Sequence, residues 1–171
     1  MVLGSAVLSP DGSVLAAYAG SRIYLWNGVT GVQQTEIYKV TEDREEAPIS
    51  IAELAFSPDG HWLASGGDQI RLWDVSFNSI QTLQAEFATR LEPGAWHVAF
   101  SADGRLLAAS SELQTEIWDV TERKLIATVE GGQAQFLPDD RIISLSAAAV
   151  SIWDAEGKLL TELSGEKWGA K

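Results

Sequence analysis

The chain has no cysteine among its 171 residues. This absence excludes disulfide bonds and cysteine-ligated zinc sites, and it agrees with a reducing compartment, so we expect a cytoplasmic protein. Long apolar runs are also missing, since none approaches the ~20 residues that a membrane-spanning helix needs. Residues Met1–Ser5 lack the basic segment that opens a signal peptide, and we expect none.

Basic residues are scarce. Lys and Arg number 12 against 24 Asp and Glu, which gives a net charge of −12. Binding to nucleic acid or to an anionic membrane requires an excess of cations, so the balance excludes both. The acidic surface keeps the chain soluble, and the sharper alternative is a basic partner.

Residues for catalysis or metal binding are scarce as well. The two histidines stand neither at metal-ligand spacing nor beside a nucleophile turn, and no glycine-rich phosphate loop is present. Asp11, Asp59 and Asp103 are repeated carboxylates, but each lies in a tight hairpin sequence where Asp is favoured for the turn itself. We therefore expect no catalytic residue, no cofactor and no metal.

The segment Leu54–Asp74 contains three short apolar runs separated by two turns. In the first turn, Pro58 presets φ and Gly60 tolerates a positive φ, which is typical of a hairpin. Glycines at 66 and 67 allow the second reversal. The pattern predicts a three-stranded antiparallel meander, which is too short to be stable alone and must pack on similar units.

The same unit recurs along the chain. Turn sequences at residues 9–12, 57–60, 101–104 and 137–140 each open a hairpin, and each hairpin leads to a strand that ends in tryptophan. These residues are Trp26, Trp73, Trp118 and Trp153. Their spacing of about 40–45 residues is that of a repeated supersecondary unit.

The sequence SPDGHWLASGGDQIRLWD of residues 57–74 resembles a WD-repeat β-propeller blade, and four such repeats cover almost the whole chain. The resemblance implies an all-β propeller of four-stranded antiparallel blades around a central channel. It also implies a binding scaffold rather than an enzyme. We expect one propeller unit over residues 1–171, with blades at about 3–40, 49–83, 96–129 and 133–163.

The outermost strands show this pattern least clearly. We expect the first blade to end with a strand over Gln33–Val40 and the second with a strand over Ser79–Leu83. Phe87 and Leu91 are four residues apart, which predicts a helical turn over Ala85–Leu91.

Four blades are few for this family, in which rings of roughly seven or eight are usual. Four would span half of an eight-bladed ring and leave two apolar blade faces open to water. We expect a second copy to close that ring as a C2 homodimer. The alternatives are a fragment of a longer propeller, a closed four-bladed monomer, and a self-assembling structural half ring with no other partner.

In the resembling family, a series of hydrogen-bonded side chains stiffens each blade. Only the second repeat has the turn aspartate of this series, as Asp68, together with Ser65 and Trp73. We place a protein or peptide partner on the loop-bearing rim, with Trp96 as an aromatic anchor. The alternatives are a Trp96 that covers the gap between blades, and a small-ligand or enzymatic site in the channel. The candidate partner-binding residues are Arg44, Asp68, Gln69, Trp96, His97 and Glu112.

Overall fold

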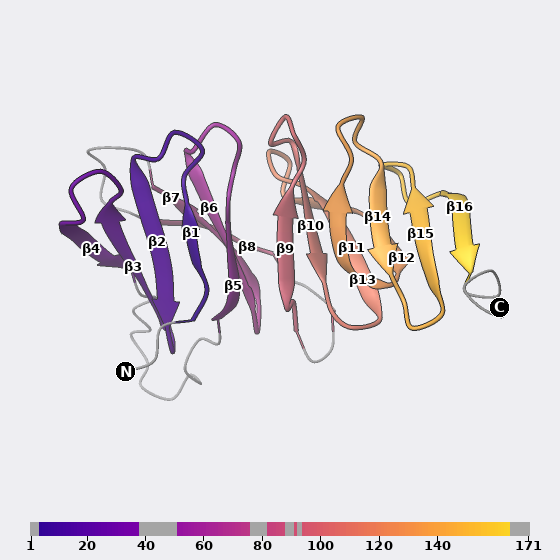
Figure 1. Cartoon of the computed structure of the whole chain (residues 1–171). Helices are drawn as coiled ribbons and strands as arrows, with labels where there is room; N and C mark the ends of the chain where they lie inside the picture. Colours follow the sequence, from indigo (N-terminus) through magenta and orange to yellow (C-terminus); the bar gives the residue numbers. More distant parts are fainter. Residues whose placement is uncertain (1–3, 38–50, 76–81, 88–90, 92–93, 165–171) are drawn as a thin grey trace, which may run out of the picture. The chain divides into compact units, whose positions relative to one another are not determined.

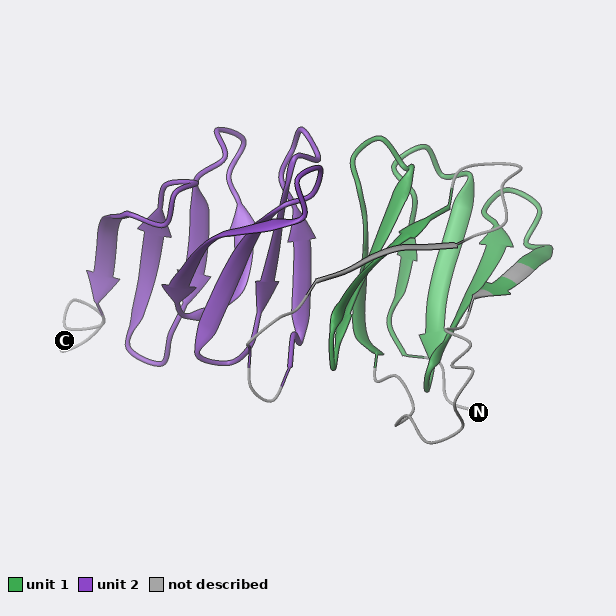
Figure 2. Ribbon diagram, turned by 180° about the vertical axis from the view of Figure 1, so that it is seen from behind, with its two compact units in different colours: residues 1–89 green, residues 90–171 purple. Residues whose placement is uncertain are grey.

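The protein is described here by a computed structural model that covers residues 4–37, 51–75, 82–87, 91 and 94–164. In these residues the regular structure consists of β-strands, arranged as four sheets of four strands each (Figure 1). Within each sheet the strands are antiparallel and follow one another in chain order. The chain divides into two compact units, Met1–Thr89 and Arg90–Lys171 (Figure 2).

Unit 1 holds the first and second sheets. The first sheet consists of β1 (Ala6–Leu8), β2 (Val14–Ala19), β3 (Arg22–Asn27) and β4 (Gln33–Ile37). The second consists of β5 (Ile51–Phe56), β6 (Trp62–Gly67), β7 (Ile70–Asp74) and β8 (Thr82–Phe87).

Unit 2 holds the third and fourth sheets. The third sheet consists of β9 (His97–Phe100), β10 (Leu106–Ser110), β11 (Gln114–Asp119) and β12 (Lys124–Glu130). The fourth consists of β13 (Gly132–Phe136), β14 (Ile142–Leu145), β15 (Ala149–Trp153) and β16 (Leu159–Ser164).

The all-β prediction is confirmed, but the outer strand of the second sheet was placed wrongly. We expected it over Ser79–Leu83, followed by a helical turn, whereas β8 runs through Phe87. Its backbone pairs with β7 from Asp74↔Thr82 to Ile70↔Phe87. Extension of the ladder along the whole of β7 satisfies the backbone groups of that strand, and this long-range pairing outweighs the four-residue spacing that suggested a helix. Similarly, β4 is observed to Ile37, and residues 38–40 of the expected strand lie outside the described residues.

Each unit buries one sheet-to-sheet core. In unit 1 the first sheet contributes Val14, Ala16, Ile23 and Leu25. The second contributes Ile51, Leu54, Leu63, Trp73 and Val75. We call the packed face of the first sheet its forward face, and the packed face of the second its rear face.

The same arrangement recurs in unit 2. Ala108, Ile117 and Val129 of the third sheet pack with Ala134 and Ile142 of the fourth. The third sheet again presents its forward face, because its pair Ala108↔Ile117 is equivalent to Ala16↔Leu25 of the first sheet. The fourth sheet again presents its rear face, because its pair Ile142↔Trp153 is equivalent to Leu63↔Trp73 of the second sheet. Residues at alternate positions share one face of a strand, so each sheet has one face of each kind.

Candidate functional site

The repeated hairpin aspartates are acceptors within their own turns. Asp11 accepts hydrogen bonds from the Ser9 hydroxyl at 2.7 Å and from the Ser13 backbone N–H at 3.0 Å. Asp103 accepts from the Ser101 hydroxyl at 2.7 Å and from the backbone N–H of residue 105 at 2.9 Å. Asp59 makes the equivalent pair of contacts with Ser57 and His61. In the described part of the chain, no group of three or more Asp, Glu, His or Cys could hold a metal ion.

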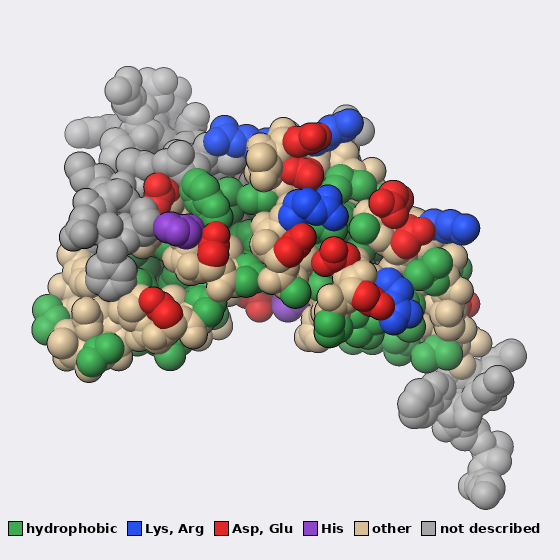
Figure 3. All heavy atoms as spheres, turned by 90° about the horizontal axis from the view of Figure 1, so that it is seen from above, with side chains coloured by type: hydrophobic (Ala, Val, Ile, Leu, Met, Phe, Trp, Pro, Cys, Tyr) green, Lys and Arg blue, Asp and Glu red, His purple; other side chains and the backbone are tan. Residues whose placement is uncertain are grey.

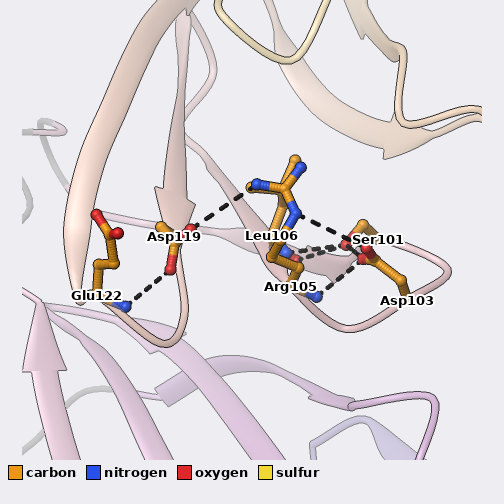
Figure 4. A network of polar contacts seen from close by, with 6 residues as sticks. All are labelled: Ser101, Asp103, Arg105, Leu106, Asp119 and Glu122. Atoms are coloured by element: carbon orange, nitrogen blue, oxygen red, sulfur yellow. Dashed lines mark hydrogen bonds and ion pairs between the residues drawn. The ribbon is translucent and has the colours of Figure 1, made fainter.

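The serine that opens each of the first three hairpins is buried and links the turn to the next strand. Ser101 Oγ accepts from the Leu106 backbone N–H at 2.9 Å, as Figure 4 shows. In the same network Arg105 lies between Asp103 and Asp119, at 3.7 and 3.8 Å. Figure 3 views the strand ends that carry these hairpins, where acidic and basic side chains are interspersed. The hairpin ends of unit 2 thus form a mixed surface rather than a patch of one sign.

These hydrogen bonds stabilise the charged form of the turn carboxylates. The Ser9 hydroxyl, followed by the backbone N–H and hydroxyl of Ser13, lowers the pKa of Asp11 from 3.8 to about 2. The Ser101 hydroxyl likewise lowers the pKa of Asp103. Each depressed pKa contributes stability that is fully present above about pH 3.8 and is lost as the pH falls through the folded-state value.

We therefore expect Asp11→Asn to weaken the acid sensitivity of folding. Asn keeps an acceptor oxygen but does not titrate, so the variant should be less stable than the wild type at pH 7, and the two should converge as the pH falls from about 4 to about 2. Urea unfolding across this range measures the effect. Glu156→Gln, in the turn between β15 and β16, removes the same charge as a control. An unchanged slope in Asp11→Asn would contradict the assignment.

The strand-ending tryptophans have three kinds of surroundings, one of which is shared by Trp73 and Trp153. Trp73 Nε1 donates to Ser65 Oγ at 3.0 Å, and Trp153 Nε1 donates to Ser144 Oγ at 2.9 Å. Trp118 Nε1 donates to a carboxylate oxygen of Glu116 at 3.2 Å. Trp26 instead stacks on Tyr24, with ring centroids 6.0 Å apart.

The expected series of hydrogen bonds among the side chains of Asp68, Ser65 and Trp73 forms only in part. Ser65 bonds the indole, but Asp68 accepts two hydrogen bonds from the Arg71 guanidinium, at 2.9 and 3.0 Å. The Arg71 side chain is buried, so this bidentate pair fixes the β6–β7 turn. The Ser144–Trp153 pair was missed because the fourth repeat has alanines in place of the turn aspartate.

The opposite strand ends of unit 2 carry an open groove. We call this end of the sheets the rim: it bears the turns from second to third strands and the connections from fourth strands to the next sheet. The groove has a volume of 590 Å³. It is lined by Ser111, Glu112, Leu113, Gln114, Glu130, Gly131, Ser146 and Ala147, and we call these residues the rim groove.

Hydrogen bonds between backbone and side chains hold the walls of the rim groove. Gly131 N–H donates to the Leu113 carbonyl at 2.7 Å, and the Thr115 hydroxyl donates to the Gly131 carbonyl at 2.7 Å. On the other wall, Ser144 Oγ donates to the Glu130 carbonyl at 2.6 Å. The walls are therefore fixed, while the side chains of Glu112, Leu113 and Glu130 are exposed.

Comparison with known proteins agrees with this repeat architecture. Residues 45–74 match the family described as WD domain, G-beta repeat. The chain is 28% identical over 148 residues to WD repeat-containing protein SL1-17 of Schistosoma mansoni, which covers 86% of this chain. It is 36% identical over 121 residues to small ribosomal subunit protein RACK1 of Candida albicans (strain SC5314 / ATCC MYA-2876), which covers 66% of it. The chain therefore carries a WD repeat at residues 45–74 and is similar to WD-repeat proteins over most of its length.

A solved structure shows the same fold. The structure titled "Structure of U3-55K" superposes with a TM-score of 0.76 over 92% of this WD-repeat chain, at 21% identity. The chain spans 42% of the length of SL1-17, 35% of RACK1 and 50% of the U3-55K chain. The described residues include no helix with the length and apolarity to cross a membrane.

Three of the residues expected at the partner surface of this WD-repeat chain lie near one another in unit 2. Trp96 is 58% exposed, and its backbone N–H donates to the Ser110 carbonyl at 2.7 Å. His97 pairs with Ser110 in the sheet and is half-buried. Glu112 follows directly after Ser111 and lines the rim groove.

The other three expected residues lie elsewhere. Asp68 and Gln69 form the β6–β7 turn of unit 1, and Arg44 lies outside the described residues. Sequence reasoning missed Leu113 and Glu130. The available signal for Leu113 was a leucine within an otherwise polar turn, where it has no strand partner to bury it.

Proposed function

We propose that this WD-repeat chain is a non-catalytic scaffold that binds a protein or peptide segment at the rim of unit 2. One observation carries the proposal: the rim groove places an exposed leucine between two glutamates. Leu113 is 76% exposed, although its backbone carbonyl is held at 2.7 Å from the Gly131 N–H. A fixed backbone that presents an exposed apolar side chain is suited to binding, because little order must be gained on association.

The charges indicate the chemistry of the partner. Glu112 and Glu130 line the groove, the described residues that line it include no Lys, Arg or His, and the whole chain has a net charge of −12. A segment with basic side chains on both sides of an apolar one would match this pattern, with the charges steering the encounter. Trp96, exposed at the same end of the third sheet, supplies a further anchor of the kind that dominates interfaces.

The polar groups of the groove favour binding over catalysis. The Ser111 hydroxyl accepts from the backbone N–H groups of Leu113 and Gln114, at 3.3 and 3.2 Å. The Ser146 hydroxyl accepts from Ala149 N–H at 3.0 Å. Both hydroxyls therefore stabilise turns, and neither is aligned with a base that would activate it.

We also propose that a second copy completes the scaffold as an eight-bladed ring formed by two chains. Four sheets per chain, which correspond to half of an eight-bladed ring, support a need for further blades. The lack of cysteine supports a cytoplasmic location.

A labelled peptide tests the binding proposal. The probe is a fluorescein-labelled Gly-Ser-Arg-Leu-Arg-Ser-Gly peptide, measured by fluorescence anisotropy, with a Gly-Ser-Glu-Leu-Glu-Ser-Gly peptide as the charge-reversed comparison. We expect only the basic peptide to bind, and Glu112→Lys to weaken it about tenfold or more because a repulsive charge replaces an attractive one.

Two further variants complete this test. Trp96→Ala should lower the affinity several-fold while the thermal midpoint stays unchanged, since the side chain is exposed. Glu156→Lys makes the same charge change in a turn outside the groove and should bind like the wild type, apart from the general effect of net charge. Equal affinity for the two peptides, or equal losses in Glu112→Lys and Glu156→Lys, would contradict binding at the rim groove.

A further inference from the structure

Both units repeat one sheet-to-sheet interface, in which the forward face of a sheet packs on the rear face of the next. In each unit a hydrogen bond joins the second strand of one sheet to the first strand of the next. In unit 1 the Tyr18 hydroxyl donates to the Ala52 carbonyl at 2.6 Å. In unit 2 the Ala134 N–H donates to the Ser110 hydroxyl at 3.1 Å. Tyr18 and Ser110 occupy equivalent positions, since each pairs with the residue that is two before the leucine or isoleucine of its third strand.

The forward face of the fourth sheet is built for burial but remains open. In the first three sheets, three central positions of this face are at most 2% exposed. They are Ala16, Ile23 and Leu25, then Ala64, Ile70 and Leu72, then Ala108, Thr115 and Ile117. In the fourth sheet the same positions hold Ile143, Val150 and Ile152, which are only half-buried. On the same face Leu145 is 41% exposed and Leu163 is 50% exposed.

The rear face of the first sheet is open in the corresponding way. In the other three sheets its central residue is fully buried, as Leu63, Leu107 and Ile142. The first sheet has Leu15 at this position, which is half-buried, as is Trp26 beside it. Leu8, on the same face, is 55% exposed. Among the described residues, the central positions are therefore left open on the forward face of β13–β16 and on the rear face of β1–β4.

The sizes of the side chains on these two faces are complementary. The forward face of the fourth sheet is the bulkier, with Ile143 where each of the other sheets has alanine. The rear face of the first sheet is the shallower, with Leu8 where the others have Phe56, Phe100 and Phe136. A larger forward face and a smaller rear face fill the same total volume, as close packing requires.

We infer that the forward face of β13–β16 packs on the rear face of β1–β4 of a second copy of this chain. The inference rests on the proposed completion by a second copy, and it assigns the surface through which that copy binds. The contact is heterologous, so two copies closing head to tail satisfy both open faces, while a failure to close would give open polymers. By correspondence with Ser110 and Ala134, Leu145 of one copy lies beside Ala6 of the other.

Cross-linking tests this register directly, because the natural chain has no cysteine. Two single-cysteine proteins, Leu145→Cys and Ala6→Cys, are mixed under mild oxidation and separated on a non-reducing gel. We expect a disulfide-linked heterodimer of twice 18.5 kDa. A mixture of Leu145→Cys with Val29→Cys, whose site is an exposed turn between β3 and β4, measures random collision. Cross-linking no greater than in this control would overturn the inference.

Solution mass provides the second readout. Light scattering should give twice 18.5 kDa for the wild type and for Val29→Lys, and 18.5 kDa for Leu163→Lys, which puts a charge on the exposed apolar face. A wild-type monomer, polydisperse aggregates that persist in Leu163→Lys, or a Leu163→Lys dimer would each overturn the inference.

The same variants separate this inference from the rim groove. Leu163→Lys should bind the Arg-Leu-Arg peptide with wild-type affinity, because a single chain supplies all the residues that line the groove and Leu163 is not one of them. A dimer that fails to bind the peptide would defeat the groove proposal and leave the interface standing. A wild-type monomer that binds the peptide would defeat the interface and leave the groove proposal standing.

Discussion

Gly132→Ala is expected to destabilise the protein by about 3 kcal/mol, at the upper end of the usual cost of overpacking. A Cβ atom built on Gly132 would lie 2.2 Å from the Ser111 carbonyl oxygen and 3.1 Å from that of Glu112. Both atoms belong to the backbone of the turn after β10, so no side-chain rotation can make room for the new methyl group. The turn or the start of β13 must move.

Such a movement is opposed from both sides of the glycine. The preceding residue donates its N–H to the Leu113 carbonyl at 2.7 Å, and Ala134 N–H donates to the buried Ser110 hydroxyl at 3.1 Å. A shift large enough to admit the methyl group breaks one of these bonds and leaves a buried polar atom without its partner, which costs about 1–3 kcal/mol.

Gly12→Ala is the matched control for this substitution. Gly12 has φ of 73°, and no atom lies within 4 Å of the position that a Cβ would take there. Its replacement by alanine therefore lowers the stability by only about 1 kcal/mol, the cost of holding a non-glycine residue in the left-handed backbone conformation. Urea unfolding followed by tryptophan fluorescence compares the two variants. If Gly132→Ala is no less stable than Gly12→Ala, the close approach of the third and fourth sheets does not constrain this site.

The sequence predicted the repeated strands well because their signals are local. A Ser-Pro-Asp-Gly turn acts within its own residues: Ser9, for example, bonds Asp11 two residues later and Val14 five residues later. The hairpin turns predicted at residues 101–104 and 137–140 accordingly lie just before the observed central strands β10 and β14, Leu106–Ser110 and Ile142–Leu145.

Features that depend on distant segments were not predictable in this way. The extent of β8 is set by pairing with β7, and the rim groove is formed by three connections that lie up to 36 residues apart in the chain, from Ser111 to Ala147. The two open faces, in contrast, were expected from the blade count alone. Their residues could be assigned only once the register of all four sheets was known.

Trp73→Ala is expected to cost about 3–5 kcal/mol, the usual loss for a large aromatic side chain removed from a core. Trp73 is 2% exposed and packs in the core of unit 1 with Leu54 and Leu63. Its loss leaves a cavity and also removes the donor to the buried Ser65 hydroxyl. Trp96→Ala is the matched control, because that side chain is 58% exposed and its removal should change stability by no more than about 0.5 kcal/mol.

Two milder variants divide the effect of Trp73 into packing and hydrogen bonding. Trp73→Phe keeps most of the ring but removes the N–H, and Ser65→Ala leaves the N–H in place without its acceptor at 3.0 Å. Each should cost about 1–3 kcal/mol, and their coupling in a double-mutant cycle isolates the bond itself. Unfolding free energies for the four proteins follow from urea titration. Should Trp73→Ala and Trp96→Ala prove equally destabilising, the distinction between a repeat tryptophan in the core and an anchor on the rim would fail, and Trp96 would belong to the packing of the third sheet.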